Sequence, residues 1–230
     1  MRIVLLHALP LDERMWEPQL EALASHQVEA PNLYALGGAS MDEWATALLE
    51  RVAGDLVVVG ASMGGYCALA VPRLAPERVR GLVLAGSRAD ADSPERKEAR
   101  QAAIERIERE GAEGMWQLMK PIVAGEIVPD DLRERLRAIA LEQPAEGLVR
   151  AVQAIRDRPD STAVVGELDV PFLAVVGDHD PIAPPEYARE LAGVAPRGEA
   201  LVFEETGHLP NLERPADFNA NLLRFLGEIG

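Results

Sequence analysis

Short, unbroken apolar runs rich in β-branched residues constrain the fold of this chain more than any other feature. Each run is bounded by glycine, proline or aspartate and is too short to form a helix of ordinary length. Runs of this kind are typical of strands that are buried on both faces, as in a parallel sheet. They cover residues 3–6, 56–59, 82–84, 172–176 and 201–203.

Helical patterns separate these strand-like runs. Apolar residues recur on one helical face within residues 42–52, 63–74, 186–191 and 215–226. Because strand and helix alternate along the chain, we expect an α/β architecture whose mainly parallel sheet carries helices on both faces.

One segment interrupts this alternation. Residues 90–162 are highly charged, follow a helical pattern and contain no strand-like run. A chain of 230 residues suits one core with an inserted subdomain. We therefore expect a core formed by residues 1–89 and 163–230, with a small helical cap insertion at 90–162. The simpler alternative is a set of helices that only packs on the core.

Composition narrows the possible partners and location. The chain has 23 Lys and Arg residues against 38 Asp and Glu residues, giving a net charge of −15. Such a surface repels nucleic acids and anionic membranes, so we expect neither as a partner. Cys67 is the only cysteine, which fits a reducing compartment, and no apolar stretch approaches the roughly 18 residues of a membrane span. We expect a cytoplasmic protein of undetermined oligomeric state.

Residues 60–64 match the pattern G-x-S-x-G between a strand-like run and a helical segment. A nucleophile on a tight strand-to-helix turn needs small neighbours, and the helix N-terminus favours developing negative charge. This context indicates that Ser62 is a nucleophile. The alternative is that Ser62 is simply a small residue at a tight turn.

A serine nucleophile requires a general base, and this chain has four histidines. His208 lies in a loop after the last strand-like run, at the end of the strand where open α/β sheets place their sites. We therefore predict that His208 is the base, although a histidine here can also cap the following helix. The other three are His7, His26 and His179.

The base in turn needs an acid that fixes its tautomer. Asp178 and Asp180 both follow the run at 172–176, so either one gives the chain order Ser, Asp, His. Asp90, which follows the preceding strand, is a further candidate.

Together these motifs resemble the α/β-hydrolase superfamily over nearly the whole chain outside the charged middle. In the superfamily's acid loop the fourth residue is the acid, which selects Asp180 over Asp178. The similar segments are residues 5–10 (first strand and oxyanion loop), 60–65 (nucleophile elbow), 177–182 (acid loop) and 207–215 (histidine loop and last helix).

The resemblance implies an α/β-hydrolase fold and a catalytic triad of Ser62, His208 and Asp180. It also implies an oxyanion hole formed by the backbone N–H groups of Leu9 and Met63, and no cofactor or metal. The chain begins directly at a parallel strand, so we expect about six strands. Ala8 stands where the superfamily usually has glycine, which predicts a slightly altered oxyanion turn.

Within the superfamily, residues 9–12 and the following Met15-Trp16 look like the small carboxylesterase and 3-oxoadipate enol-lactonase branch. The resemblance predicts a serine hydrolase that cleaves small esters or lactones through an acyl-enzyme. The alternatives are a lyase or carbon–carbon bond hydrolase of the same fold, such as a hydroxynitrile lyase, and a non-catalytic ligand-binding protein. A carboxylated lactone as substrate would predict an arginine facing the pocket, but no particular arginine is indicated.

Overall fold

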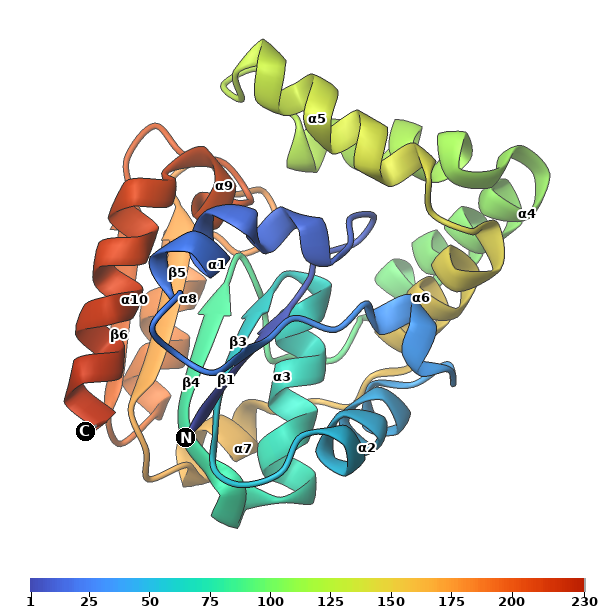
Figure 1. Ribbon diagram of the computed structural model, residues 1–230. Coiled ribbons are helices and arrows are strands. Elements are labelled where there is room, and N and C mark those ends of the chain that lie inside the picture. The colour runs from blue at the N-terminus through green and yellow to red at the C-terminus, as the bar shows by residue number, and fades with distance from the viewer. Residues whose placement is uncertain (230) are drawn as a thin grey trace.

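The computed structural model describes residues 1–229, and six parallel strands form its single sheet (Figure 1). The strand order is β2-β1-β3-β4-β5-β6, which confirms the expected parallel sheet of about six strands. The strands are β1 (Arg2–Leu6), β2 (Val28–Glu29), β3 (Leu56–Ala61), β4 (Val79–Ala85), β5 (Phe172–Gly177) and β6 (Gly198–Phe203).

Burial along the strands follows their place in the sheet. Every residue of β3 and β5 is buried, as expected for strands covered on both faces, whereas β6 at the edge is mostly half-buried. β2 is not predictable from the sequence, because a strand of two residues is too short to form a pattern.

Helices cover both faces of the sheet (Figure 1). On one face α10 packs against β4 and against α1, and on the other α3 and α8 contact the strands while α2 and α7 pack against them. These helices are α1 (Glu17–Ala22), α2 (Met41–Arg51), α3 (Met63–Leu74), α7 (Thr162–Glu167), α8 (Pro185–Val194) and α10 (Pro215–Ile229). Short single turns are η1 (Glu13–Trp16), η2 (Leu33–Leu36), η3 (Pro76–Arg78) and α9 (Pro210–Glu213).

Besides α7, three helices lie between β4 and β5 in the sequence: α4 (Pro94–Val123), α5 (Asp130–Leu141) and α6 (Ala145–Asp157). α4 packs against both α5 and α6, and it bends at Gly111, whose φ of 62° is not helical. In Figure 1 these helices occupy the upper right, beyond the carboxyl ends of the strands. Apolar residues of α4 and α6 belong to the same buried cluster as the strands.

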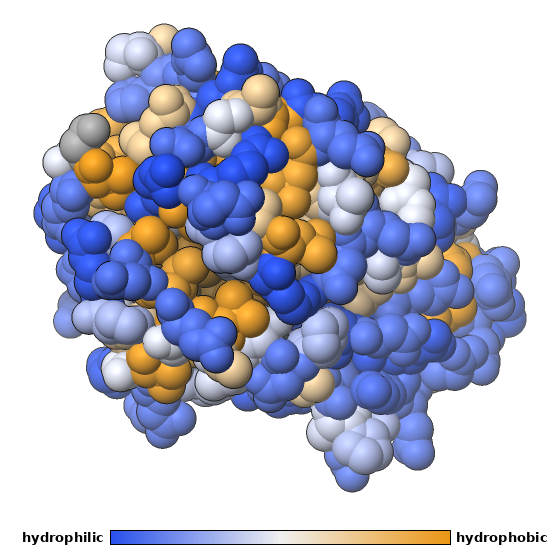
Figure 2. Space-filling model, turned by 90° about the horizontal axis from the view of Figure 1, so that it is seen from below, coloured by the Kyte–Doolittle hydropathy of each residue, from blue (hydrophilic) through white to orange (hydrophobic). Residues whose placement is uncertain are grey.

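Figure 2 shows the molecule from below, where hydrophilic residues cover much of the surface and apolar residues form separate groups among them. Within residues 1–229, every helix is too short or too polar to cross a membrane.

The order of the strands places a topological switch point at β1. β1 pairs with β2 on one side and with β3 on the other. Strands that follow β2 in the sequence are therefore added on the opposite side of β1. Open α/β sheets bind ligands at such a switch point, outside the carboxyl ends of the strands. Leu6 pairs with Gly60, so the loop after β1 and the turn after β3 begin side by side.

Candidate active site

Ser62 occupies the turn between β3 and α3 in a strained conformation. Its φ of 49° lies in the left-handed region, which costs a non-glycine residue on the order of 1–3 kcal/mol. Two hydrogen bonds hold the turn: the Ser62 N–H donates to the Ala85 carbonyl at 2.8 Å, and the Ser87 hydroxyl donates to the Ser62 carbonyl at 2.8 Å. The Ser62 side chain makes no capping hydrogen bond to α3.

Three glycines around Ser62 allow this turn to pack tightly. A Cβ atom at Gly60 would collide with the carbonyl group of Gly64, and one at Gly64 would collide with the carbonyl oxygen of Leu6. A Cβ atom at Gly65 would collide with the hydroxyl of the neighbouring serine on the loop after β4. The glycines are therefore required for contact with the adjacent chain segments.

His208 connects Ser62 to Asp180. The Nε2 atom of His208 lies 2.8 Å from the Ser62 hydroxyl, and its Nδ1 atom lies 2.9 Å from Asp180 Oδ1. A neutral imidazole has one donor and one acceptor nitrogen, so Nδ1–H donates to the carboxylate and Nε2 accepts from the hydroxyl. All three side chains are buried. The structure thus brings together the three residues that the sequence analysis selected.

The three candidate acids have different hydrogen-bond and ion-pair partners in the structure. The Asp180 carboxylate accepts hydrogen bonds from two main-chain N–H groups of its own loop besides the one from His208. Asp178 instead accepts from the Thr206 N–H at 3.0 Å, and Asp90 pairs with two arginines. Among residues 1–229, only Asp180 contacts His208 through a carboxylate hydrogen bond.

Glu213 holds the loop that carries His208. Its two carboxylate oxygens accept hydrogen bonds from the Gly207 N–H at 2.6 Å and the Leu209 N–H at 2.9 Å. The N–H groups on either side of His208 are therefore both anchored to one side chain. Sequence reasoning missed this role, although a carboxylate five residues after the candidate base, on the first helical turn, was a usable signal.

The expected oxyanion donors lie at the switch point. Leu9 follows β1 and lines the same cavity as Ser62 and His208, while Met63 begins α3. No acceptor among residues 1–229 takes a hydrogen bond from either N–H group. The φ of Ala8 is not positive, because Ser62 and Glu205 are the described non-glycine residues with positive φ.

His7 stabilises the loop after β1 and does not contact Ser62. Its Nε2 atom accepts a hydrogen bond from the Leu33 N–H at 2.8 Å, and its Nδ1–H donates to the Ala8 carbonyl at 3.2 Å. Complete burial lowers the pKa of His7 to about 4, so the ring is neutral at neutral pH. His7 therefore acts as a structural link between this loop and η2.

A narrow cavity of about 30 Å³ lies over Ser62. Most of its wall is apolar, and four of its residues come from α4 and α6. Its lining residues are Leu9, Ser62, Tyr66, Arg100, Met119, Ile122, Ile155, Ile182 and His208.

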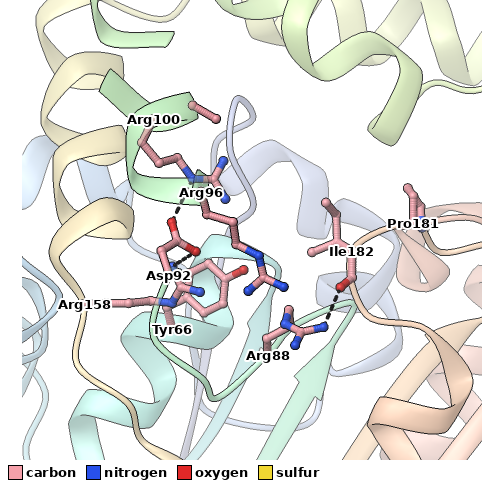
Figure 3. Close-up of a pocket in the computed structure, with 9 residues that line it drawn as sticks. Tyr66, Arg88, Asp92, Arg96, Arg100, Arg158, Pro181 and Ile182 are labelled. Atoms are coloured by element: carbon pink, nitrogen blue, oxygen red, sulfur yellow. Dashed lines mark hydrogen bonds and ion pairs between the residues drawn. The ribbon is translucent and has the colours of Figure 1, made fainter. Parts of the chain in front are cut away.

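A larger cavity of about 240 Å³ adjoins the first (Figure 3). The two cavities share Tyr66, Arg100 and Ile182. Within the described part of the chain, no three His, Cys, Asp or Glu side chains are grouped as metal ligands.

Comparisons with known proteins show which proteins this chain is similar to. Residues 3–221 match the sequence profile of the alpha/beta hydrolase family. The pimeloyl-[acyl-carrier protein] methyl ester esterase of Klebsiella pneumoniae is 27% identical over 243 residues, covering 99% of this chain and 94% of the relative.

Two solved structures are also similar. A thermophilic esterase from Thermogutta terrifontis, with malate bound, has a TM-score of 0.93 and 33% identity, covering 100% of this chain and 90% of the other. The enol-lactonase from Burkholderia xenovorans LB400 has a TM-score of 0.77 and 25% identity, covering 98% and 91% of the two chains.

Proposed function

The chain belongs to the alpha/beta hydrolase family, and we propose that it is a serine hydrolase that cleaves small carboxylic esters. The observation that carries this proposal is the continuous series of hydrogen bonds from Asp180 through His208 to Ser62, at 2.9 and 2.8 Å. The esterases among its relatives support the same reaction class.

The first half of the reaction forms an acyl-enzyme. Ser62 Oγ attacks the carbonyl carbon of the ester while its proton passes to His208 Nε2. The tetrahedral intermediate then expels the alcohol, which takes the proton back from Nε2 as the carbon–oxygen bond breaks. Asp180 keeps the Nδ1 proton in place and stabilises the imidazolium that forms between these steps.

The second half releases the acid. A water molecule gives its proton to His208 Nε2 and attacks the acyl carbon, and the second tetrahedral intermediate expels Ser62 Oγ, which recovers the proton. A lactone follows the same steps, except that the alcohol stays attached to the acyl group until the acid is released.

Two backbone N–H groups are suited to stabilise the oxyanion of both intermediates. Leu9 follows β1 and Met63 follows β3, two strands that pair through Leu6 and Gly60, and neither N–H group has an acceptor among residues 1–229. Pro10 has no N–H and cannot contribute. One such donor is typically worth about 3 kcal/mol in the transition state.

Residues 90–162 are proposed to act as a cap over this site. Their helices α4 and α6 contribute Arg100, Met119, Ile122 and Ile155 to the wall of the cavity over Ser62. A mostly apolar wall limits access of water and strengthens the electrostatic interactions inside the site. The cap is therefore expected to select the substrate.

Hydrolysis of p-nitrophenyl esters of increasing acyl length tests the proposal, together with labelling by a p-nitrophenyl phosphonate. We expect turnover, and a covalent adduct on Ser62 identified by peptide mass spectrometry. Ser62→Ala removes both, whereas Ser25→Ala, which changes an exposed serine, keeps both. Absence of turnover by the native protein, or activity that survives in Ser62→Ala, refutes the proposal.

A further inference from the structure

Four arginines line the larger cavity beside Ser62, although the chain as a whole carries a net charge of −15. Arg88 follows β4, Arg96 and Arg100 lie on α4, and Arg158 follows α6. Figure 3 shows the guanidinium groups of Arg88, Arg96 and Arg158 around the ring of Tyr66. This positive cluster is therefore assembled from segments that are distant in the sequence.

The carboxylates that pair with these arginines are too few to neutralise them. Asp90 pairs with Arg88 at 2.7 Å and with Arg96 at 2.9 Å. Partial burial raises the pKa of Asp90, but the hydrogen bonds from these two arginines outweigh this effect and lower the pKa overall. This carboxylate is therefore ionised.

The second carboxylate, Asp92, pairs with Arg100 at 3.1 Å and with Arg158 at 2.8 Å. Within residues 1–229 the ion pairs of the four arginines therefore involve two carboxylates. Two positive charges remain uncompensated next to the cavity. Partly buried cations in excess favour the binding of an anion.

Stacking and burial hold the cluster in position before any ligand binds. The Arg158 guanidinium lies 4.0 Å from the centre of the Tyr66 ring, and its side chain is only 4% exposed. The Arg88 guanidinium lies 3.9 Å from the centre of the Tyr187 ring. Because these side chains are already ordered, an anion that binds them loses little free energy to their immobilisation.

Arg100 connects the charged cavity to the nucleophile. It lines both this cavity and the one over Ser62. Its Nε–H donates to Asp92, and its two terminal nitrogens donate no hydrogen bond to any described residue. These nitrogens are therefore available to a bidentate anion, the geometry in which a guanidinium binds a carboxylate most strongly.

We propose that this arginine cavity binds a carboxylate of the substrate, so that the enzyme acts on esters that carry a second, ionised carboxyl group. The inference rests on the proposed ester hydrolysis and names its substrate class. Arg100 is the main determinant of this specificity, and Arg96 contributes. Both the acyl part and the alcohol part of an ester are bonded to the carbonyl carbon that Ser62 attacks. Either part can therefore carry the carboxylate into the arginine cavity.

Paired substrates test the proposal and distinguish the two placements. The acyl arm compares monoethyl glutarate with ethyl pentanoate, and the alcohol arm compares 3-acetoxypropanoate with propyl acetate. We expect kcat/KM to be at least about 10-fold higher for the charged ester in one arm. Arg100→Gln is expected to lower that ratio roughly 10- to 100-fold, the range typical of a hydrogen bond to a charged group.

Arg106→Gln is the matched control, because Arg106 lies on the same helix and pairs with Glu110 outside the cavity. It should keep the ratio of the native enzyme. If Arg100→Gln fails to fold, as judged by circular dichroism, Arg96→Gln replaces it and should lower the same ratio.

Calorimetric titration of glutarate and of 3-hydroxypropanoate into Ser62→Ala, with and without Arg100→Gln, measures binding without catalysis. Ser62-dependent hydrolysis with no preference for a charged ester and no binding of either acid overturns the arginine cavity but leaves ester hydrolysis intact. Arg100-dependent binding without turnover of any ester has the opposite meaning: the cavity binds carboxylates, and the proposed hydrolysis is wrong.

Discussion

The Nδ1 atom of His208 donates its hydrogen bond to Asp180, at 2.9 Å, and not to Asp178, which lies two residues earlier in the same loop. The loop after β5 turns between these two aspartates. It places the first carboxylate on the Thr206 N–H at 3.0 Å and buries the second against the imidazole. Neighbouring carboxyl groups thus have different positions and different expected roles.

Exchanging each aspartate for asparagine tests this difference. In Asp180→Asn the uncharged amide neither fixes the His208 tautomer nor stabilises the imidazolium, so kcat should fall by about 10⁴-fold. In Asp178→Asn the amide oxygen still accepts from Thr206, and kcat should stay within about 10-fold of the native value. Steady-state kinetics with p-nitrophenyl butyrate measure both. If kcat fell further in Asp178→Asn than in Asp180→Asn, the assignment of Asp180 as the acid would be wrong.

Gly64 is expected to be irreplaceable, whereas Gly227 is not. A Cβ atom at Gly64 would collide with the Leu6 carbonyl oxygen, so Gly64→Ala should lower the free energy of unfolding by about 3 kcal/mol and impair activity. Gly227 lies within α10 with no neighbouring atom within 4 Å of its added Cβ. Gly227→Ala should therefore raise stability by about 0.5 kcal/mol. Urea unfolding of the two variants measures the contrast, and equal effects would refute it.

Glu213 is expected to matter for both stability and catalysis. Glu213→Ala removes the acceptor of two N–H groups beside His208, which should cost about 2 kcal/mol of unfolding free energy and lower kcat. The matched control is Glu228→Ala, because Glu228 is an exposed partner of Arg224 and should contribute less than about 1 kcal/mol. Unfolding curves and kinetics of both variants test this. A stable and fully active Glu213→Ala protein would show that other contacts position the loop.

The buried His7 should make the protein less stable in mild acid. Burial lowers the pKa of His7 from 6.5 to about 4, so between these values the unfolded chain binds a proton that the folded chain does not. The free energy of unfolding therefore decreases as the pH falls through this window, by about 3 kcal/mol in total from this group.

Urea unfolding at pH 7, 6, 5 and 4 isolates this contribution. In His7→Gln the amide oxygen can still accept from Leu33, and the stability should vary less with pH than in the native protein. The exposed His26 provides the control, since His26→Gln should keep the native pH dependence. Parallel pH profiles for the native protein and His7→Gln would contradict the assignment.

The sheet and the nucleophile turn were predictable because their causes are local. Strands buried on both faces need continuous apolar runs, and a tight turn against neighbouring chains needs glycines, so both features leave a pattern in adjacent residues. β2 left no pattern in the sequence. Its two residues are in a strand because they pair with β1, and not because of their own composition.

The site was predictable in part. The pattern of residues 60–64 and the loop around His208 indicated two of the three hydrogen-bonded residues. The chemistry of the residues left Asp178, Asp180 and Asp90 as candidate acids, and only the resemblance to the superfamily's acid loop selected Asp180. Which carboxylate reaches the imidazole depends on how a loop turns, and three nearby aspartates offer no compositional signal for it.

The sequence by itself thus determined the parallel α/β sheet, the order of its motifs and the serine at the strand-to-helix turn, because each follows from burial or backbone geometry within a few residues. The hydrogen bond between His208 and Asp180, which the resemblance implied, depends on how the loop after β5 folds, and only the tertiary structure decided which arginines gather beside Ser62. Arg100 lies on α4, whereas Arg88 and Arg158 lie in the segments after β4 and α6. Helical periodicity shows that such residues lie on a polar face, but the docking of α4 and α6 against the core determines which of them face the cavity.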